Sequence, residues 1–408
     1  MDETTDAVLA QLTAAAAAAA PVLAALPAER RAELVRTIAD RVDSDSDSLA
    51  AIADQETSLG MVRLRGEVAR TSGQLRMFGN VVVEGSYVEA IIDTADPSAL
   101  PPKPDLRRML VPIGPVAVFS ASNFPFAFSV VGGDTASALA AGCPVVVKAH
   151  SGHPRLSNAV AEIVHSVVSE LGLPAGTFGL VHGREIGRAL VVDPAIKAAG
   201  FTGSVNGGRA LFDLASGRPD PIPFYGELGS LNSVVVTPAA AASRGQEIAT
   251  GLVSSFTLGV GQFCTKPGVV LVPDGAGIEK LVADALPSAT GGRMLTPSIH
   301  DAYTKGLAAI EGTGKAERLG AASEGGEGVG VPAAYSTTVA DLLERSDVLL
   351  EECFGPVALL VRYADAAELT AALAALPPAL TATADDDVEL AGGQHVDEVG
   401  DAMRSHEH

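Results

Sequence analysis

Short apolar segments that alternate with helical segments between residues 114 and 228 restrict the fold of this chain more than any other feature. The clearest are VAVFS (116–120), PVVVK (144–148) and FGLVHG (178–183), and each precedes a stretch of helical periodicity. Strands that alternate with helices in this way form βαβ units around a parallel sheet. The pattern resumes further along the chain, in SVVVTP (233–238), GVVLVP (268–273) and ALLVRY (358–363). The sequence therefore predicts an α/β protein with two such regions.

The length of 408 residues is enough for two domains, and we expect the boundary after residue 232. The first domain, residues 1–232, begins with helical periodicity. Within it, residues 83–110 contain two strand-like segments around the proline-rich link SALPPKP, which favours a hairpin-like arm for oligomerisation. The second domain covers residues 233–378. Residues 379–408 are acidic and lack a clear period, so we expect a disordered tail.

Charge and cysteine content limit the partners and the compartment. The chain has 28 basic and 49 acidic residues, a net charge of −21, which argues against nucleic acid and membrane as partners. Its three cysteines include no CxxC pair, so neither a disulfide framework nor a metal site is expected. The acidic N-terminus is unlike a secretory signal, and the alanine-rich run 12–21 is expected to be a helix that ends near Pro21 and is too short to span a bilayer. We expect a cytoplasmic protein.

A candidate nucleophile lies in GQFCTKP (261–267), where Cys264 follows glycine and polar residues and precedes a proline and an apolar run. Glu227, in the glycine-flanked segment GELG, is the candidate base. Thiol chemistry needs such a pair, because the thiolate is the reactive species and a base must later activate water. The alternative for an isolated cysteine is a buried, inert thiol. We interpret Cys143 and Cys353 in that way, as structural residues.

Six motifs in the same order along residues 5–375 together resemble the aldehyde dehydrogenase superfamily. Their wording looks most like the branch of 2-oxoglutarate semialdehyde (2,5-dioxovalerate) dehydrogenases, and NADP-dependent fatty aldehyde dehydrogenases are similar in the same region. The resemblance implies a Rossmann-like cofactor domain and a second α/β catalytic domain. The motifs are VPIGPVAVFSASNFPFAF, AAGCPVVVKAH, FTGS, GELGSLNSVVV, GQFCTKPG and EECFGPV.

The resemblance implies a role for each catalytic residue. Cys264 would attack the aldehyde carbon, and Asn123 would donate its side-chain N–H to the developing oxyanion. After hydride transfer to the nicotinamide, Glu227 would activate the water that hydrolyses the thioester. Simpler roles remain open at this stage: Asn123 could only shape a turn, and Glu227 could be a charge at the end of a strand.

The chain contains no GxGxxG motif, so the usual dinucleotide fingerprint is absent from the sequence. The resemblance instead implies that Gly203 and Ser204 lie near the pyrophosphate, at a helix N-terminus. Lys148 would bind the adenosine ribose, while Glu352 and Phe354 would contact the nicotinamide side of the cofactor. The alternatives are an ordinary capped helix, a solvated strand end and a surface carboxylate.

The residue three positions after Lys148 bears on the choice of cofactor. NAD-preferring relatives often carry a glutamate there, whereas this chain has Ser151 between His150 and His153. A carboxylate would repel the 2′-phosphate of NADP, and a hydroxyl and imidazoles would not. We therefore predict NADP as the cofactor, with NAD possible. The histidines could equally be ordinary loop residues.

The resemblance fails at the C-terminal end. Beyond the position that corresponds to residue 375, family members continue with a segment that completes the catalytic domain and supplies a strand to a partner subunit. We therefore expect a C-terminal truncation, which a frameshift near residue 380 would explain. The resemblance implies a homo-oligomer, and the loss of that strand leaves the oligomeric state of this chain open.

The first functional hypothesis is an NAD(P)-dependent aldehyde dehydrogenase that oxidises an aldehyde, 2-oxoglutarate semialdehyde in the first instance. The alternative is a catalytically impaired remnant that binds dinucleotide or partner subunits without turnover. A third hypothesis is an esterase that uses Cys264 without a cofactor. A substrate carboxylate calls for a cation, but the sequence does not place Arg107, Arg108 or Arg155 near the site.

Overall fold

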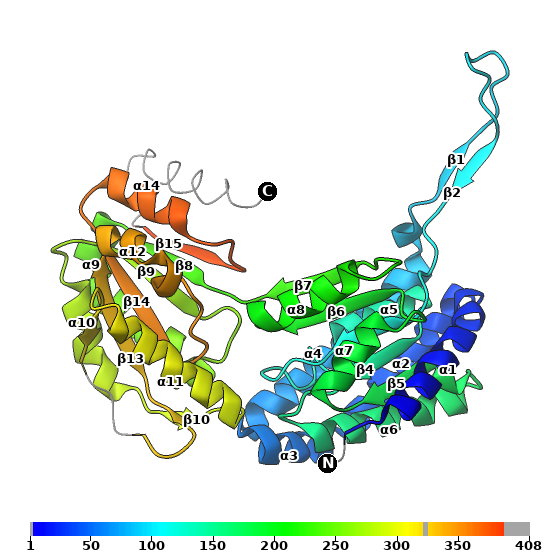
Figure 1. The fold of residues 1–408 in the computed structure, drawn as a ribbon, viewed down its shortest axis with the longest axis horizontal. Helices are drawn as coiled ribbons and strands as arrows, with labels where there is room; N and C mark the ends of the chain where they lie inside the picture. The colour runs from blue at the N-terminus through cyan, green and yellow to red at the C-terminus, as the bar shows by residue number, and fades with distance from the viewer. Residues whose placement is uncertain (1–2, 321–324, 387–408) are drawn as a thin grey trace. The chain divides into compact units, whose positions relative to one another are not determined.

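The computed structural model describes residues 3–320 and 325–386, and the chain divides into two compact units after Leu228 (Figure 1). Each unit contains a largely parallel sheet with helices on both faces, which confirms the predicted α/β fold class. The predicted boundary, residue 232, lies close to this division.

The sheet of the first unit has five parallel strands in the order β5-β4-β3-β6-β7. The chain runs from β3 outwards through β4 to β5 and then returns to place β6 on the other side of β3. This reversal creates a switch point between β3 and β6, where open α/β sheets bind ligands at the carboxyl ends of their strands. The strands are β3 (Val116–Phe119), β4 (Val145–Lys148), β5 (Phe178–Val181), β6 (Ala198–Gly203) and β7 (Phe224–Leu228).

Helices cover both faces of this sheet because its valine-rich strands are buried on both sides. One face packs against α2, α4, α5 and α6, and the other against α1, α7 and α8. The 24-residue helix α4 is the longest helix of the unit. The helices are α1 (Asp6–Ala24), α2 (Ala28–Ser44), α3 (Ser46–Thr57), α4 (Met61–Glu84), α5 (Gly133–Ala141), α6 (Pro154–Glu170), α7 (Arg184–Val192) and α8 (Val205–Ser216), with the short turns η1 (Ser86–Val88) and η2 (Ala175–Thr177).

Helix α1 is longer than the sequence analysis expected. It begins six residues before the alanine-rich run and continues through Pro21 to Ala24, although the proline has no N–H to donate to the preceding turn. By length and composition alone it could therefore cross a membrane, and it is the one such helix found in the described part of the chain. Its side chains Leu9, Thr13 and Ala16 are buried, and the Thr13 hydroxyl donates to Asp193 Oδ2 over 2.7 Å.

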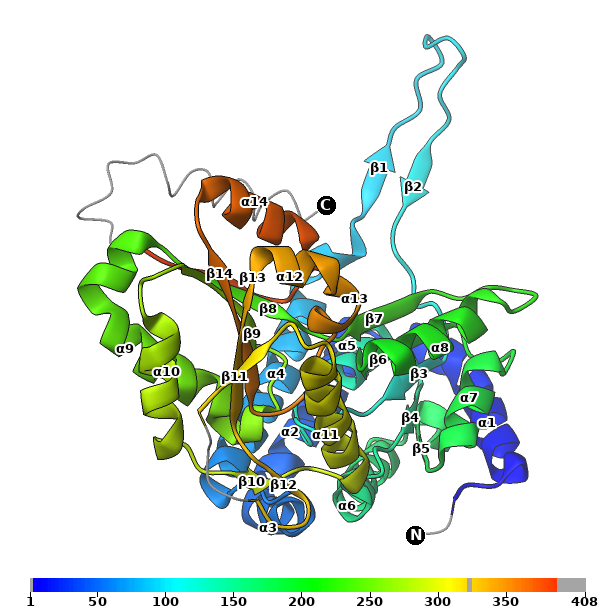
Figure 2. The same ribbon diagram turned by 60° about the vertical axis from the view of Figure 1, so that its left-hand side comes forward.

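A hairpin arm extends from the end of α4. Strands β1 (Ile91–Asp93) and β2 (Leu106–Arg108) pair antiparallel, and both views show the arm standing away from the rest of its unit (Figures 1 and 2). The two strands predicted around the proline-rich link are thereby confirmed. Several of the arm's apolar side chains, including Ile92 and Leu100, are exposed.

The sheet of the second unit has the strand order β11-β13-β14-β9-β8-β15, with β11 as its one antiparallel member. Helices α11, α12 and α14 pack on one face, and α9 and α10 pack on the other. The strands are β8 (Asn232–Val236), β9 (Pro267–Pro273), β11 (Glu317–Leu319), β13 (Ala333–Thr338), β14 (Val357–Tyr363) and β15 (Ala382–Asp385), beside a small pair, β10 (Gly292–Arg293) and β12 (Val329–Gly330). The helices are α9 (Pro238–Thr257), α10 (Ile278–Ala285), α11 (Pro297–Gly312), α12 (Val339–Glu344), α13 (Ser346–Leu349) and α14 (Ala366–Ala375), with the turns η3 (Leu258–Gly261) and η4 (Leu286–Ser288).

Strand β15 differs from the predicted disordered tail. Residues 382–385 pair in parallel with β8, although the sequence analysis assigned 379–408 to the tail. Backbone pairing needs no apolar pattern, and the acidic side chains have partners: Arg244 lies 3.4 Å from Asp385, and the Thr237 hydroxyl donates to Asp386 over 2.9 Å. The rest of the predicted tail, residues 387–408, lies outside the described residues.

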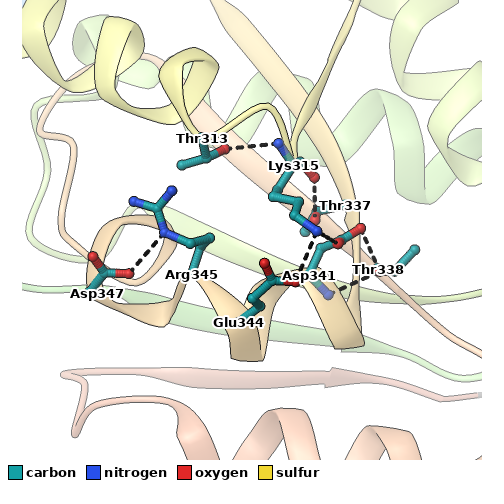
Figure 3. Close-up of polar contacts among 8 residues, drawn as sticks. All are labelled: Thr313, Lys315, Thr337, Thr338, Asp341, Glu344, Arg345 and Asp347. Atoms are coloured by element: carbon teal, nitrogen blue, oxygen red, sulfur yellow. Dashed lines mark hydrogen bonds and ion pairs between the residues drawn. The ribbon is translucent and has the colours of Figure 1, made fainter.

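A polar network joins the end of α11 to β13 and α12 (Figure 3). Lys315 Nζ lies 2.9 Å from both Asp341 and Glu344, and the Thr338 hydroxyl caps α12 by accepting from the Asp341 N–H. The Thr337 hydroxyl donates to the Lys315 carbonyl over 2.8 Å. Because the charged groups pair with one another, we assign this network to the fold and not to a ligand site.

Candidate active site

One edge of the first sheet brings together five of the residues singled out in the sequence. The strand register sets Lys148 beside Phe119, and Thr202 beside Glu227. Asn123 lies in the loop after β3, and Gly203 and Ser204 follow at the end of β6. All of these residues lie at the carboxyl edge of the sheet, next to the switch point between β3 and β6.

The loop that carries Asn123 is held by helix α4. Arg63 Nη2 donates to the Asn123 carbonyl over 2.6 Å. Glu67 Oε1 accepts two backbone N–H groups of the same loop, from Phe126 over 2.8 Å and from Ala127 over 3.0 Å. These contacts hold the loop against α4, although the bonded residues are about 60 positions apart in the chain.

Glu67 is a functional candidate that the sequence analysis missed. Its side chain is only 5% exposed, and burial raises the pKa of its carboxyl group, while the two loop N–H groups and the charges of Arg63 and Arg70 oppose that shift. A signal was present in the sequence, because Glu67 falls on the apolar stripe of α4 that contains Leu64 and Val68. A carboxylate on a buried stripe needs partners, and here they are the loop amides.

The candidate base Glu227 lies at the carboxyl end of β7 and is half-buried. A second carboxylate lies within its electrostatic reach: loss of hydration raises the pKa of Asp134, and the negative charge of Glu227 adds to that rise. Asp134 belongs to the first turn of α5, and its carboxylate lies against Gly200 of β6. No role was predicted for Asp134 from the sequence.

The loop after β4 contains Lys148, Ser151 and the two histidines. Ser151 is exposed, and Lys148 is half-buried with a pKa lowered by burial and by Arg184, against the opposing charge of Glu3. His153 is fully buried, with Nε2 2.9 Å from the Ala121 carbonyl. The loop thus has one exposed hydroxyl and one cation near the sheet edge.

Both histidines of this loop are neutral at pH 7. Burial lowers the pKa of His150 to about 3, and the nearby His153 and Lys148 contribute to that shift. Burial also lowers the pKa of His153, whose two ring nitrogens lie close to Ala121 and Ser157. The structure therefore gives His153 the role of an ordinary loop residue, one that links the loop after β3 to α6.

Helix α8 begins beside the end of β6. The Ser204 hydroxyl accepts from the Gly207 N–H over 3.2 Å, so the predicted helix cap is present. Ser204 is exposed, and the N–H groups of the first turn favour an anion. Together with the ammonium group of Lys148, this edge fits the phosphate and ribose groups of a dinucleotide.

The second set of predicted residues lies in the second unit, where two loops pack together. Gly259, Val260 and Gly261 adopt left-handed backbone angles with φ of 56°, 60° and 63°, which turn the chain before Cys264. A Cβ atom at Gly261 would lie 2.2 Å from the Gly355 carbonyl oxygen, so only glycine allows this contact. The cysteine loop therefore packs against the EECFGP loop, and Cys264 itself is only partly buried.

Asn232, at the start of β8, holds the cysteine loop in place. Its Nδ2 donates to the Cys264 carbonyl over 2.8 Å and to the Lys266 carbonyl over 2.9 Å. Its Oδ1 accepts from the Ser230 hydroxyl and from the Thr381 N–H, so this buried amide connects the loop to the segment before β15. Asn232 belongs to the GELGSLNSVVV motif, but no role was predicted for it from the sequence.

The EECFGP loop places Glu352 and Phe354 as half-buried residues. Burial raises the pKa of Glu352, and a hydrogen bond from the Ser230 N–H and the charge of Lys266 oppose the rise. Lys266 is itself buried, donates to the Val357 carbonyl over 2.7 Å, and has a pKa lowered to about 8 by burial. These contacts fix the loop that carries Glu352.

Neither of the other two cysteines resembles a nucleophile. Cys143 is buried, and Cys353 lies with its sulfur 3.7 Å from the Tyr303 carbonyl. Burial raises the pKa of Cys353 to about 11, which disfavours its thiolate. Over residues 3–320 and 325–386, no cluster of three or more histidine, cysteine or acidic side chains could hold a metal ion.

Comparison with known proteins gives consistent results. The sequence profile described as "Aldehyde dehydrogenase family" matches residues 1–384. The chain is 46% identical over 371 residues to alpha-ketoglutaric semialdehyde dehydrogenase 2 of Azospirillum brasilense, a match that covers 90% of this chain and 71% of that protein. It is 41% identical over 367 residues to alpha-ketoglutaric semialdehyde dehydrogenase of Acinetobacter baylyi, with coverage of 87% and 68%.

A solved structure shows the same fold. An NAD-dependent benzaldehyde dehydrogenase from Corynebacterium glutamicum superposes with a TM-score of 0.79 at 21% identity, over 99% of this chain and 85% of that one. At this level of identity the likeness concerns the fold.

Proposed function

Because this chain belongs to the aldehyde dehydrogenase family, we propose that it oxidises alpha-ketoglutaric (2-oxoglutarate) semialdehyde to the carboxylate with NADP. The observation that carries the substrate is the similarity, over about nine tenths of the chain, to two dehydrogenases named for this semialdehyde. The structure of the Cys264 loop supports attack by its thiol on the aldehyde. Cys264 is only partly buried, and its loop is held by Asn232 and by the packing of Gly261 on Gly355.

In the proposed reaction, the Cys264 thiolate attacks the aldehyde carbon and forms a carbon–sulfur bond. The negative charge that develops on the carbonyl oxygen receives hydrogen bonds from the Asn123 side chain and the Cys264 backbone N–H. A dinucleotide held by Lys148, Ser204 and Glu352 would supply the hydride acceptor, and loss of hydride from the carbon would leave a thioester on Cys264. Glu227 then removes a proton from water, the water oxygen attacks the thioester carbon, and the thiolate leaves as the carboxylate forms.

The residues at the edge of the first sheet support the proposed cofactor contacts. Lys148 would bind the adenosine ribose, and Gly203 and Ser204 would face the pyrophosphate at the N-terminus of α8. In the second unit, Glu352 and Phe354 would contact the nicotinamide side. The chain's own contribution is to hold these groups in place, because their loops are tied by Arg63, Glu67 and Asn232.

The preference for NADP rests on Ser151 and Lys148. Ser151 is exposed and uncharged, so no carboxylate at this position repels a 2′-phosphate. The neutral His150 and His153 add no positive charge, and we therefore expect a modest preference. The test is the ratio of kcat/KM for NADP and NAD in the native chain and in Ser151→Glu. A native preference for NAD would overturn the proposal.

The proposed activity is tested with a panel of aldehydes and a cysteine variant. We expect NADPH formation to be fastest with the semialdehyde, and Cys264→Ala to lower it by about 10³-fold or more while dinucleotide binding persists. Cys143→Ala is the matched control, because that buried thiol lies before the amino end of β4, opposite the carboxyl edge of the sheet, and the variant should keep activity. Dinucleotide binding by the native chain without any NADPH formation would overturn the proposal.

We also propose a cytoplasmic location and a role for the hairpin arm in assembly. Three unpaired cysteines favour a reducing compartment, and we place the protein in the cytoplasm. The exposed apolar side chains of the hairpin arm support a role in subunit contacts. Size measurement of the native chain, beside a variant with Ile92→Ser and Leu106→Ser, tests the role of the arm.

A further inference from the structure

We propose that Arg70 of helix α4 binds the carboxylate at the far end of the substrate and so selects a charged semialdehyde over an uncharged aldehyde. The inference rests on the proposed function, in which the Asn123 side chain donates a hydrogen bond to the aldehyde oxygen. It names the residue that recognises the other end of the same short molecule.

The position of Arg70 beside the Asn123 loop carries the inference. Its guanidinium carbon lies 5.5 Å from the ring centroid of Phe124 and 5.4 Å from that of Phe128. The two rings contact each other edge to face at 5.4 Å, and Phe124 directly follows Asn123 in the chain. The guanidinium of Arg70 thus lies against the side chain that directly follows Asn123, the residue whose amide would donate to the aldehyde oxygen.

The mode of contact leaves the guanidinium able to bind an anion. A guanidinium group over an aromatic ring uses its face for that contact, and its N–H donors point outwards in its own plane. Those donors match the two oxygens of a carboxylate. The rings cover part of the guanidinium, and its exposed part is open to an anion.

Arg70 differs from the other two charged residues on the same side of α4. Arg63, Glu67 and Arg70 are spaced by four and three residues, so they follow one another along one face of the helix. Arg63 is bonded to the Asn123 carbonyl, and Glu67 is bonded to two loop amides. Arg70 is exposed, and in the described parts of the chain it has ring contacts and the attraction of Glu67 but no hydrogen bond.

The charge of the whole chain favours a local cation as the group that recognises an anionic substrate. A net charge of −21 does not attract an anion at long range, and a nearby positive group offsets that net charge locally. The arginines considered in the sequence analysis have other positions: Arg107 and Arg108 lie on the hairpin arm, and Arg155 donates to Gln55. Arg70, by contrast, is an exposed cation in contact with Phe124 and Phe128 of the Asn123 loop.

The test compares two substrates in three variants. The substrates are 2-oxoglutarate semialdehyde and pentanal, which has the same number of carbon atoms and no carboxylate. We expect Arg70→Gln to lower kcat/KM for the semialdehyde roughly 10- to 100-fold, mainly through KM, and to change that for pentanal less than about threefold. Arg70→Lys should recover part of the loss, because the charge returns without the paired donors.

Arg65→Gln is the matched control. Arg65 is an exposed arginine of the same helix, paired with Asp47, and its replacement should leave both substrates unaffected. If Arg70→Gln lowers kcat/KM equally for both substrates, or for neither, the inference is overturned. A displaced or unfolded loop would affect both substrates, so pentanal separates damage to the fold from lost recognition. If the native enzyme shows no preference for the semialdehyde, the proposed substrate fails, whatever the variants do.

Discussion

Replacing Glu67 by alanine removes the carboxylate that holds the loop around Asn123. The side chain is 5% exposed and accepts N–H groups from Phe126 and Ala127 at 2.8 and 3.0 Å. Without it, both amides lose their acceptor in a place that water reaches poorly. We expect Glu67→Ala to loosen the loop as well as to lower the stability of the first unit.

The magnitude follows from the number of bonds and their burial. A hydrogen bond to a charged group contributes about 1.5–3 kcal/mol. Glu67 accepts two such bonds, and the loss of hydration that raises the pKa of its carboxyl group offsets part of their contribution. We expect Glu67→Ala to lower the free energy of unfolding by about 3 kcal/mol. Glu67→Gln keeps a carbonyl acceptor without the charge and should cost about 1 kcal/mol.

The chain offers a matched control for this experiment. Glu56 accepts the backbone N–H groups of Arg155 and Leu156 at 2.9 and 3.0 Å, so it makes the same number of bonds, but it is partly exposed. Water replaces the lost acceptor there, and Glu56→Ala should cost about 1 kcal/mol or less.

Urea unfolding followed by circular dichroism measures the stability. Hydrogen exchange of the peptide covering residues 120–132 measures the loop directly, and exchange should become faster in Glu67→Ala but not in Glu56→Ala. If the two alanine variants lose the same stability, or if exchange of the loop does not change, the argument from burial is refuted.

Three further predictions concern the proposed chemistry and the second unit. Glu227→Gln should slow thioester hydrolysis about 10²- to 10⁴-fold, so that rapid mixing shows a burst of NADPH equal to the enzyme present, followed by slow turnover; steady turnover at the native rate would contradict the role of this base. Asn232→Ala removes two donors to the cysteine loop and should lower the stability of the second unit by about 2–3 kcal/mol and reduce kcat; an unchanged kcat would show that the loop needs no such support. Burial lowers the pKa of Lys266 from 10.5 to about 8, so between these pH values the unfolded chain binds more protons than the folded chain and the free energy of unfolding rises with pH. Urea unfolding of the native chain and of Lys266→Met at pH 8 and pH 10 measures this contribution. The free energy of unfolding of the native chain minus that of the variant should be larger at pH 10, and a smaller value there would contradict burial as the cause.

The sequence predicted the parallel sheets and the motif residues because both leave local marks. Valine-rich runs are typical of strands buried on both faces, and FTGS and GQFC are contiguous segments. Strand β15 escaped prediction because its polar residues show no alternation and pair with β8 through the backbone. The histidines beside Lys148 were considered possible cofactor contacts. Burial makes both of them neutral, and His153 forms a hydrogen bond with the Ala121 carbonyl.

Arg63, Glu67 and Asn232 were given no role because their partners are distant in the chain. Glu67 bonds to amides 59 and 60 residues away, and Asn232 joins Cys264 to Thr381. A charged residue on the apolar stripe of α4 was a usable signal that some partner must exist. It could not say which partner.

The sequence by itself determined the α/β class, the hairpin arm, the family and the chemical identity of the site residues. These properties follow from periodicity and from short motifs, which act over a few neighbouring residues. Only the tertiary structure decided which side chains hold the Asn123 and Cys264 loops, which groups are charged, and which arginine remains exposed beside the Asn123 loop. Burial and hydrogen bonding between distant segments set those properties, and both depend on the path of the whole chain.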